Sequence, residues 1–255
     1  YAIEAGAKMI GVTGTRGKST VAHMIFHTLQ QAGKHVHLGG NIRGTSTLAM
    51  LPQIESGDIC VLELDSWQLQ GFGDLKISPH VAVFTNLMPD HMNYYGGNME
   101  KYFADKANIF RFQKQGDVLI VGASIADRIR ASSPPLDPII PEPIPRTWAL
   151  RILGEHNREN ASFAAAALEA SGLTDEDIRS GVESFESVEG RLQFVRELNL
   201  PRVAGGKAGG VKIYNDNNAT TPEATVAALK ALDRGKKNII LIAGGSDKGL
   251  DISAL

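Results

Sequence analysis

The sequence has a single cysteine, Cys60, in 255 residues. A disulfide framework is therefore excluded, which favours a reducing compartment, and the apolar neighbours of Cys60 predict that it packs in the core. No apolar run is long enough for a membrane-spanning helix, and the first residues lack the charged start and apolar centre of a signal peptide. We therefore expect no membrane insertion and a cytoplasmic location.

An excess of positive charge is also missing, because 26 Lys and Arg stand against 28 Asp and Glu, a formal net charge of −2. No basic field favours nucleic acid as a partner, so any site for a phosphorylated ligand must be local. The hydrophobic fraction of 43% excludes a disordered chain, and the length suits one large or two ordinary domains. Residues 1–7 lead directly into a core strand, and the last residues follow a loop that should precede a helix. We therefore expect a fragment.

The stretch Ile10–Thr20, IGVTGTRGKST, has the pattern of a phosphate-binding loop between a buried strand, Lys8–Thr13, and an amphipathic helix. Glycines in such loops let backbone N–H groups point at phosphate oxygens, the lysine reaches the terminal phosphates, and a hydroxyl ligates Mg²⁺. The positive end of the helix dipole adds to the attraction. The common spacing GxxxxGK[ST] needs a glycine where this chain has Val12, so a glycine turn with a solvated lysine is the alternative. The predicted loop residues are Gly14, Thr15, Arg16, Gly17, Lys18, Ser19 and Thr20.

Acidic and imidazole side chains follow two later strands. Glu63 ends an apolar run, where a carboxylate costs free energy to bury unless a cation such as nucleotide-bound Mg²⁺ lies opposite. Glu63 could instead cap a helix or pair with an arginine. The predicted strand Val81–Asn86 leads into Asp90 and His91, which alone would indicate only a turn. Because parallel strands end at one edge of a sheet, we expect these three side chains to converge with Lys18 there.

The remaining periodic stretches predict an α/β fold with a mostly parallel sheet flanked by helices. Strands are expected at His35–Leu38, Ile59–Leu64, Val118–Gly122 and Trp148–Leu153, and helices at Met99–Gln115, Arg158–Ser171 and Thr174–Phe185. The sequence of predicted strands and helices begins anew near residue 188, which we interpret as a domain boundary. A second, incomplete α/β unit is then expected, with strands Leu192–Leu198, Val211–Asp216 and Asn238–Gly244 and a helix Pro222–Arg234. On these patterns alone, Lys106 is a surface lysine, and Asn157 and Asn160 cap a helix.

Nine ordered stretches resemble motifs of the Mur ligase family and cover nearly the whole chain. They are GVTGTRGKST at the loop, GGNIRGT at 39–45, LELDSWQL at 62–69, TNLMPDHMNYY at 85–95, ADKANIF at 104–110, GEHNREN at 154–160, EGRLQFV at 189–195, NDNNATTPEAT at 215–225 and AGGSDKG at 243–249. The family's own loop has the glycine spacing found here, which accounts for Val12. The resemblance implies that residues 1–187 are the central P-loop ATPase domain of a three-domain enzyme. Residues 188–255 would be the first, incomplete part of its Rossmann-like C-terminal domain, and the N-terminal UDP-binding domain is absent from this chain.

Within the family, the motifs are most similar to those of ligases that add D-glutamate to UDP-N-acetylmuramoyl-L-alanine in peptidoglycan precursor synthesis. The resemblance implies a monomer that uses ATP and two Mg²⁺ ions, and that forms the amide through an acyl phosphate. Alternatives are a folylpolyglutamate or poly-γ-glutamate synthase, the latter sharing the TRGK sequence, and a non-catalytic nucleotide-binding module. The LELDSWQL and GGNI stretches in combination favour the D-glutamate ligases.

The resemblance also implies roles for individual residues. Catalysis is expected to need Lys18, Glu63, His91 and Lys106. Mg²⁺ is expected on Ser19 or Thr20, Glu63, His91 and Lys106, the lysine as a carbamate. Nucleotide contacts beyond the loop are expected from Asn157, Asn160, Arg191 and Asp216, and substrate contacts from Asn41, Thr220 and Lys248. Three positions depart from the family pattern: Asp65 stands for a serine, Asn93 for an aspartate and Asn218 for a lysine that faces the amino acid. The loss of that cation weakens the case for D-glutamate specifically, although Lys248 remains.

Overall fold

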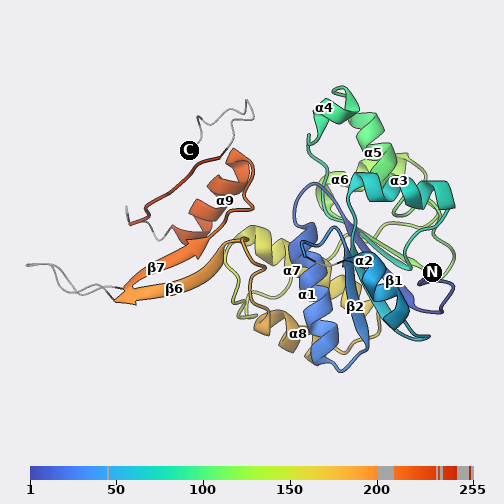
Figure 1. Cartoon of the computed structure of the whole chain (residues 1–255), viewed down its shortest axis with the longest axis horizontal. Helices are drawn as coiled ribbons and strands as arrows, with labels where there is room; N and C mark the ends of the chain where they lie inside the picture. The colour runs from blue at the N-terminus through green and yellow to red at the C-terminus, as the bar shows by residue number, and fades with distance from the viewer. Residues whose placement is uncertain (45, 200–209, 234, 236–237, 246–252, 254–255) are drawn as a thin grey trace, which may run out of the picture. The chain divides into compact units, whose positions relative to one another are not determined.

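The chain divides into two units in this computed structural model, which describes residues 1–44, 46–199, 210–233, 235, 238–245 and 253 (Figure 1). The first unit consists of Tyr1–Ala149 with Arg158–Phe185, and the second of Leu150–Asn157 with Glu186–Leu255. The helix α7 (Glu155–Glu169) contributes residues to both.

A five-stranded parallel sheet is the centre of the first unit, in the order β2-β3-β1-β4-β5. Its strands are β1 (Lys8–Thr13), β2 (Val36–Gly40), β3 (Ile59–Glu63), β4 (Val81–Phe84) and β5 (Val118–Val121). Val12 pairs in register with Glu63, and Thr13 pairs with Phe84. The carboxyl ends of β3, β1 and β4 therefore lie at one edge of the sheet. The predicted α/β fold with a parallel sheet is confirmed.

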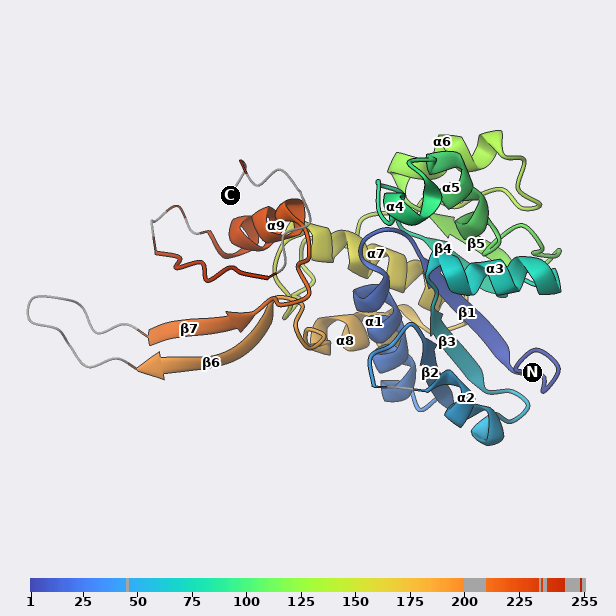
Figure 2. The ribbon, with the colours of Figure 1, turned by 45° about the horizontal axis from the view of Figure 1, so that its top comes forward.

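Helices cover both faces of this sheet, as Figure 2 shows. α1 (Lys18–Gln31) and α8 (Asp175–Ser184) pack together on one face, while α3 (Ser66–Leu75), α5 (Met99–Ala107) and α6 (Ala123–Ala131) share a hydrophobic core on the other. Short connections hold α2 (Thr47–Met50), a 3₁₀ turn (Leu51–Gln53) and α4 (Met92–Tyr95). Gly181 lets α8 approach α1 closely, because a Cβ there would lie 2.4 Å from Cγ2 of Thr28.

The strands are apolar on both faces because both are covered. Cys60 is fully buried in β3, which confirms the prediction that it packs in the core. Two polar residues at strand ends are also buried, Thr13 in β1 and Glu63 in β3. Burying these groups requires polar or charged partners at the carboxyl edge of the sheet.

The second unit contains an antiparallel pair, β6 (Gln193–Asn199) and β7 (Gly210–Asn215), and the helix α9 (Pro222–Leu232). The proline at the first position of α9 has a preorganised φ and needs no backbone donor there. Two predicted strands and the predicted helix of this unit are confirmed within a few residues.

Two predicted strands are wrong. At 148–153, the N–H of Trp148 donates to the carbonyl of Pro145 in a turn, and the N–H of Ala149 donates to the Glu183 carboxylate at 2.9 Å. These N–H groups are therefore not available to pair with a neighbouring strand. The residue that pairs with β5 on its outer side is Ile139, which forms a parallel bridge with Ile120. The apolar run 238–244 forms no strand, since no described strand lies beside it to pair with, and its Ile240 is 90% exposed.

Two predicted helices differ at their ends. The α5 helix stops at Ala107 instead of continuing to Gln115, because the chain goes on in tighter turns such as Phe110 N–H to the Ala107 carbonyl. The α7 helix begins at Glu155, three residues before the predicted start.

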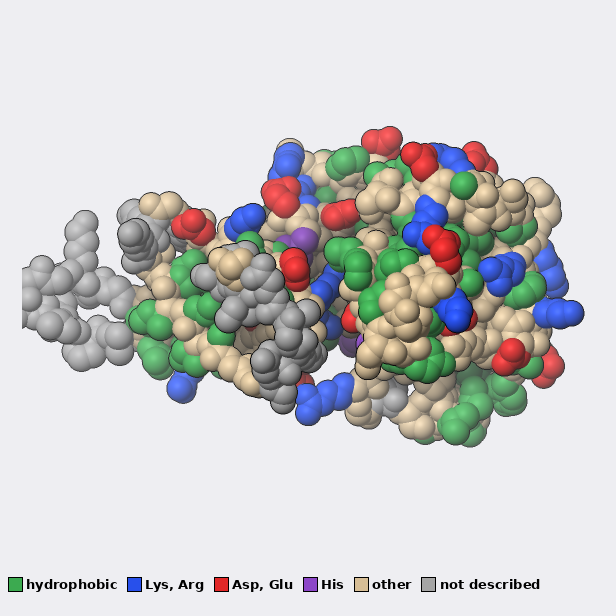
Figure 3. Space-filling view, turned by 90° about the horizontal axis from the view of Figure 1, so that it is seen from above, with side chains coloured by type: hydrophobic (Ala, Val, Ile, Leu, Met, Phe, Trp, Pro, Cys, Tyr) green, Lys and Arg blue, Asp and Glu red, His purple; other side chains and the backbone are tan. Residues whose placement is uncertain are grey.

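Charges of both signs are interspersed on the face of the first unit seen in Figure 3, in keeping with the small net charge. Within the described part of the chain, no helix has the length and apolar character needed to cross a membrane.

Candidate active site

The predicted phosphate-binding loop connects β1 to α1 and depends on two glycines with positive φ. Gly14 has φ 141°, and a Cβ there would lie 2.0 Å from Oγ1 of Thr85. Gly17 has φ 86° and is the N-cap residue of α1, where a Cβ would lie 2.4 Å from Oδ1 of Asn160. Both positions therefore require glycine. Because Gly17 brings no capping side chain, the first turn of α1, with Ser19 and Thr20, presents its backbone N–H groups to a ligand.

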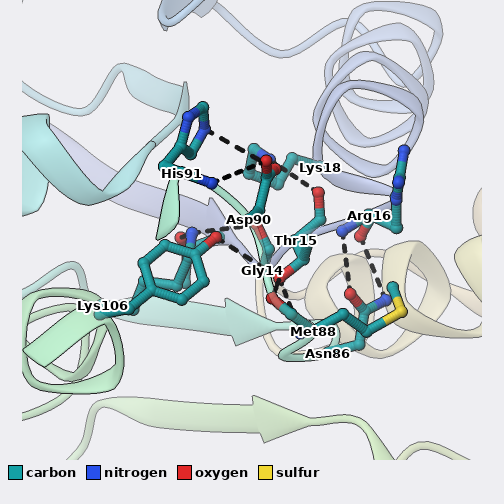
Figure 4. Close-up of polar contacts among 11 residues, drawn as sticks. Gly14, Thr15, Arg16, Lys18, Asn86, Met88, Asp90, His91 and Lys106 are labelled. Atoms are coloured by element: carbon teal, nitrogen blue, oxygen red, sulfur yellow. Dashed lines mark hydrogen bonds and ion pairs between the residues drawn. The ribbon is translucent and has the colours of Figure 1, made fainter. Parts of the chain in front are cut away.

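The loop is held in shape by the end of β4 (Figure 4). Oδ1 of Asn86 accepts the N–H of Arg16 at 2.9 Å, and its Nδ2 donates to the Arg16 carbonyl at 3.3 Å. Oγ1 of Thr85 donates to the same carbonyl at 2.6 Å, and the Asn86 carbonyl accepts the N–H of Thr15. This network fixes the loop before any ligand binds. The sequence analysis assigned no role to Asn86. Asn86 is the last residue of the predicted strand Val81–Asn86, and so was expected at the carboxyl edge of the sheet.

Two lysines meet on one carbonyl of the loop. Nζ of Lys18 donates to the carbonyls of Gly14 at 3.0 Å and Thr15 at 3.2 Å. Nζ of Lys106, from α5, donates to the same Gly14 carbonyl at 3.0 Å and to Oγ1 of Thr13 at 3.2 Å. Lys106 is only 1% exposed, so the prediction from pattern alone that it is a surface lysine is wrong. The turn of α5 that carries it faces β1 rather than solvent.

The environment of Lys106 favours its uncharged amine. Burial lowers the pKa of Lys106 well below its ordinary value, and the nearby charge of Lys18 lowers it further. The carboxylates of Asp65, Asp90 and Glu63 act in the opposite direction and do not prevail. These influences also show that the two lysines and three carboxylates share one electrostatic neighbourhood at the sheet edge.

Glu63 ends β3 beside the loop and is 4% exposed. Its carbonyl accepts the N–H of Asn41 at 2.8 Å, which holds the start of the 41–46 segment against the same edge. A Cβ at Gly40 would lie 2.0 Å from that carbonyl, so the close approach of β2 requires glycine with its φ of 88°. The side chain of Asn41 is exposed. Asp65, two residues after Glu63, forms a capping box with Gln68 at the start of α3.

His91 lies at the rim of the site. It has φ 53°, precedes α4, and its Nε2 is 3.6 Å from Oδ2 of Asp90. Its ring contacts Trp67 edge-on with centroids 4.6 Å apart. The preceding segment is tied to the loop because Oγ1 of Thr15 accepts the N–H of Met88 at 2.9 Å and donates to its carbonyl at 3.1 Å. The segment with Asp90 and His91 therefore stays beside the phosphate-binding loop.

No group of three or more His, Cys, Asp or Glu side chains that could hold a metal occurs among the residues that the structure describes. Mg²⁺ does not require one, since it keeps several waters and binds one or two carboxylates together with substrate phosphates. The Ser19 hydroxyl at the start of α1 and the buried Glu63 carboxylate supply a donor set of that kind. The residues present therefore fit nucleotide-bound Mg²⁺.

Of the other predicted nucleotide contacts, only Asn160 belongs to the first unit, where it is buried against Gly17. Arg191 and Asp216 lie close together in the second unit. Asp216 accepts the Leu192 N–H at 2.8 Å, and burial raises its pKa although that bond, Arg191 and His156 oppose the rise. Burial likewise lowers the pKa of His156.

The remaining predicted contacts are scattered through the second unit or lie outside the described residues. Asn157 donates through Nδ2 to the Leu153 carbonyl at 2.7 Å. Thr220 is exposed just before α9. Asn218, which departs from the family pattern, donates to the Glu189 carbonyl at 3.1 Å. Lys248 lies outside the described residues.

Comparisons with known proteins agree on one family. Residues 12–134 match the Mur ligase middle domain. The chain is 37% identical over 259 residues to the UDP-N-acetylmuramoylalanine–D-glutamate ligase of Sphingopyxis alaskensis, covering 97% of this chain and 55% of that protein. It is 36% identical over 272 residues to the enzyme of the same name from Symbiobacterium thermophilum, covering 96% of this chain and 56% of that protein. The chain thus spans about half the length of these relatives.

A solved structure shows the same fold at lower sequence similarity. The MurF ligase of Thermotoga maritima, in complex with ADP, superposes with a TM-score of 0.66 at 16% identity, covering 90% of this chain and 57% of that one. At this identity the likeness concerns the fold alone. The domain match and the similar sequences point to the same family as the sequence motifs, the parallel sheet and the glycine loop. Residues 12–134 of this chain are thus a Mur ligase middle domain.

Proposed function

We propose that a protein containing this chain is an ATP-dependent amide ligase that adds D-glutamate to UDP-N-acetylmuramoyl-L-alanine. The observation that carries this proposal is the meeting of Lys18, buried Lys106 and buried Glu63 around the glycine loop at the end of β1. The names of the relatives from Sphingopyxis alaskensis and Symbiobacterium thermophilum support the choice of substrates. In this proposal, residues 1–187 are the central ATP-binding domain and residues 188–255 begin the C-terminal domain.

The reaction has two steps whose atoms balance. A carboxylate oxygen of the UDP-linked substrate attacks the γ-phosphorus of ATP, the bond to the β-phosphate oxygen breaks, and ADP leaves. The amine nitrogen of D-glutamate then attacks the acyl carbon, the C–O bond to phosphate breaks, and inorganic phosphate departs as the amine loses a proton. Both steps place negative charge on oxygens that must be stabilised without rearrangement.

The loop residues supply that stabilisation. Backbone N–H groups at residues 14–20 bind the phosphates, and the network from Asn86 keeps them aimed before the nucleotide arrives. Lys18, which donates to the Gly14 and Thr15 carbonyls, turns its ammonium to the transferred phosphoryl group. Asn160, packed on Gly17, and Asn157, Arg191 and Asp216 are assigned to the rest of the nucleotide.

One Mg²⁺ ion would be held by Ser19 or Thr20 together with Glu63. A second ion would be held by His91 and a carbamate on Lys106. Both ions would neutralise negative charge on the phosphates. Carbamate formation adds CO₂ to the neutral Lys106 amine, giving N–COO⁻ and releasing one proton. The burial that lowers the pKa of Lys106 favours the neutral amine that this addition needs. Substrate contacts are assigned to Asn41, Thr220 and Lys248.

Substrate dependence of phosphate release tests this function. We expect a protein containing this chain to release phosphate from ATP only when UDP-N-acetylmuramoyl-L-alanine and D-glutamate are both present, because the acyl phosphate is consumed by the amine. Parallel assays replace D-glutamate with L-glutamate and the UDP-linked substrate with a folate. Equal turnover with L-glutamate on the folate would contradict the assignment and favour the polyglutamate ligases, which Asn218 and the TRGK sequence bring into consideration. Nucleotide binding with no turnover on any acceptor would indicate a non-catalytic module.

A further inference from the structure

The short helix α4 has little of its own to hold it in place. It contains four residues, Met92–Tyr95, and is followed by Gly96 and Gly97, both with positive φ. A single helical turn is not stable by its own hydrogen bonds. Within α4 only Tyr95 is buried, at 6% exposure, whereas Tyr94 is 56% exposed. The position of α4, and of His91 directly before it, therefore depends on what Tyr95 contacts.

Tyr95 is anchored by one carboxylate of α5. The phenol of Tyr95 donates to Oδ2 of Asp105 at 3.0 Å. The same oxygen accepts Nε2 of Gln70, from α3, at 2.8 Å. Burial raises the pKa of Tyr95, so the phenol keeps the proton that it donates. Asp105 thus connects α3 and α4 to α5 through a single oxygen.

Asp105 connects α3, which carries Trp67, with α4, which directly follows His91, and the Trp67 and His91 rings meet at the rim of the site. Trp67 lies three residues before Gln70, and so on the same side of α3. Its ring is 4.6 Å from the His91 ring and 5.4 Å from the Tyr94 ring. His91 is exposed, and its side chain is held by the Trp67 ring and by the carboxylate of its neighbour Asp90.

We propose that Asp105 is a positioning residue for His91, acting through Tyr95 on α4 and through Gln70 on α3. Asp105 itself does not touch the reacting groups. The inference rests on the proposed function, since that function assigns His91 to a Mg²⁺ ion. Residues that orient a metal ligand typically change metal affinity about 10- to 100-fold when they are replaced.

The first experiment measures phosphate release against Mg²⁺ concentration. Asp105→Ala and Tyr95→Phe should each raise the Mg²⁺ concentration for half-maximal rate by about tenfold. Asp105→Asn keeps an accepting oxygen and should lie near wild type. Affinity for ADP should stay unchanged, because the loop contacts do not involve Asp105. The matched control is Asp74→Ala, which removes an exposed carboxylate from α3. The double variant Asp105→Ala/Tyr95→Phe should be no worse than Asp105→Ala alone, since the bond between Tyr95 and Asp105 is already lost in that single variant.

The second experiment reads the His91 position without activity. Within this chain, Trp148→Phe leaves Trp67 as the single tryptophan, and His91→Ala should then change the fluorescence of Trp67 because the rings are in contact. In the Asp105→Ala background, His91→Ala should have little further effect. An equal change in both backgrounds, or no change in either, would overturn the proposal. The proposal would also be overturned if Asp105→Ala lowered the melting temperature but left the Mg²⁺ concentration for half-maximal rate unchanged. If the wild-type protein releases no phosphate, the proposed function fails while the fluorescence comparison still decides the position of His91.

Discussion

Replacing Lys106 with alanine should lower substrate-dependent phosphate release by about 1,000-fold, the upper range for removing one preorganised group from an active site. Lys106 is buried, donates to Thr13 and to the Gly14 carbonyl, and is assigned the carbamate that completes the second metal site. Alanine removes that carboxylate together with its stem. The cavity left in place of the side chain should admit small anions, so acetate or formate should restore part of the rate. Initial rates with and without the added acid measure the effect.

The control for this variant is Lys101→Ala, which removes an exposed lysine one turn or more away on the same helix. It should retain wild-type activity. Circular dichroism of Lys106→Ala checks that loss of the buried side chain has not unfolded the protein. Normal activity in a folded Lys106→Ala protein would refute the carbamate, and loss of activity with no rescue by any small acid would refute the proposed role of its carboxylate.

Replacing Lys18 with alanine should lower phosphate release by about 100- to 1,000-fold, because a charge aimed at the transferring phosphoryl group is lost. The ammonium lies over the glycine loop, bonded to the Gly14 and Thr15 carbonyls. Lys106 shares the Gly14 carbonyl, but its burial favours the uncharged amine, so it does not replace the lost charge. Single-turnover rates separate this effect from nucleotide binding, which fluorescent ADP measures directly.

Lys34→Ala provides the comparison, because Lys34 is exposed just beyond the end of the same helix. It should bind ADP and release phosphate like wild type. If Lys18→Ala also kept both properties, the loop would be a glycine turn with a solvated lysine and the assignment of a phosphate site would be wrong.

The strand, loop and helix at residues 8–31 could be predicted because neighbouring residues in the sequence determine their structure. A buried apolar strand, glycines where φ is positive and a helical period specify the element without reference to distant residues. The same holds for the remaining strands of the sheet, whose apolar runs are bounded by polar turns. Convergence of Lys18 and Glu63 at one edge then follows from parallel pairing alone.

The burial of Lys106 could not be predicted from the pattern of its own segment. Lysine is almost never fully buried, so composition favours a surface position. The burial of Lys106 results from tertiary packing, because α5 places this side chain against Thr13 at the end of β1. One signal was present, since Tyr102 lies four residues before Lys106 and both share a helix face, with Nζ 5.0 Å from the ring centre. The family resemblance pointed to Lys106 where periodicity did not, and its chemical role stays a prediction.

The two wrong strands failed for a related reason. Residues 148–153 and 238–244 have strand-like composition, but a strand forms only where a neighbour offers free hydrogen-bonding groups. In the first stretch, backbone donors go to Pro145 and Glu183. The second has no described neighbour. The Tyr95–Asp105–Gln70 connection was equally hidden, because it joins three helices through side chains that are individually unremarkable in sequence.

Formation of the proposed acyl phosphate can be followed with one isotope measurement. UDP-N-acetylmuramoyl-L-alanine labelled with ¹⁸O in its carboxylate is turned over with ATP and D-glutamate by a protein containing this chain. Because the attacking carboxylate oxygen leaves with phosphorus, we expect one ¹⁸O atom in each inorganic phosphate released, as measured by mass spectrometry. Phosphate that carries no label, with amide product formed, would contradict the proposed acyl phosphate.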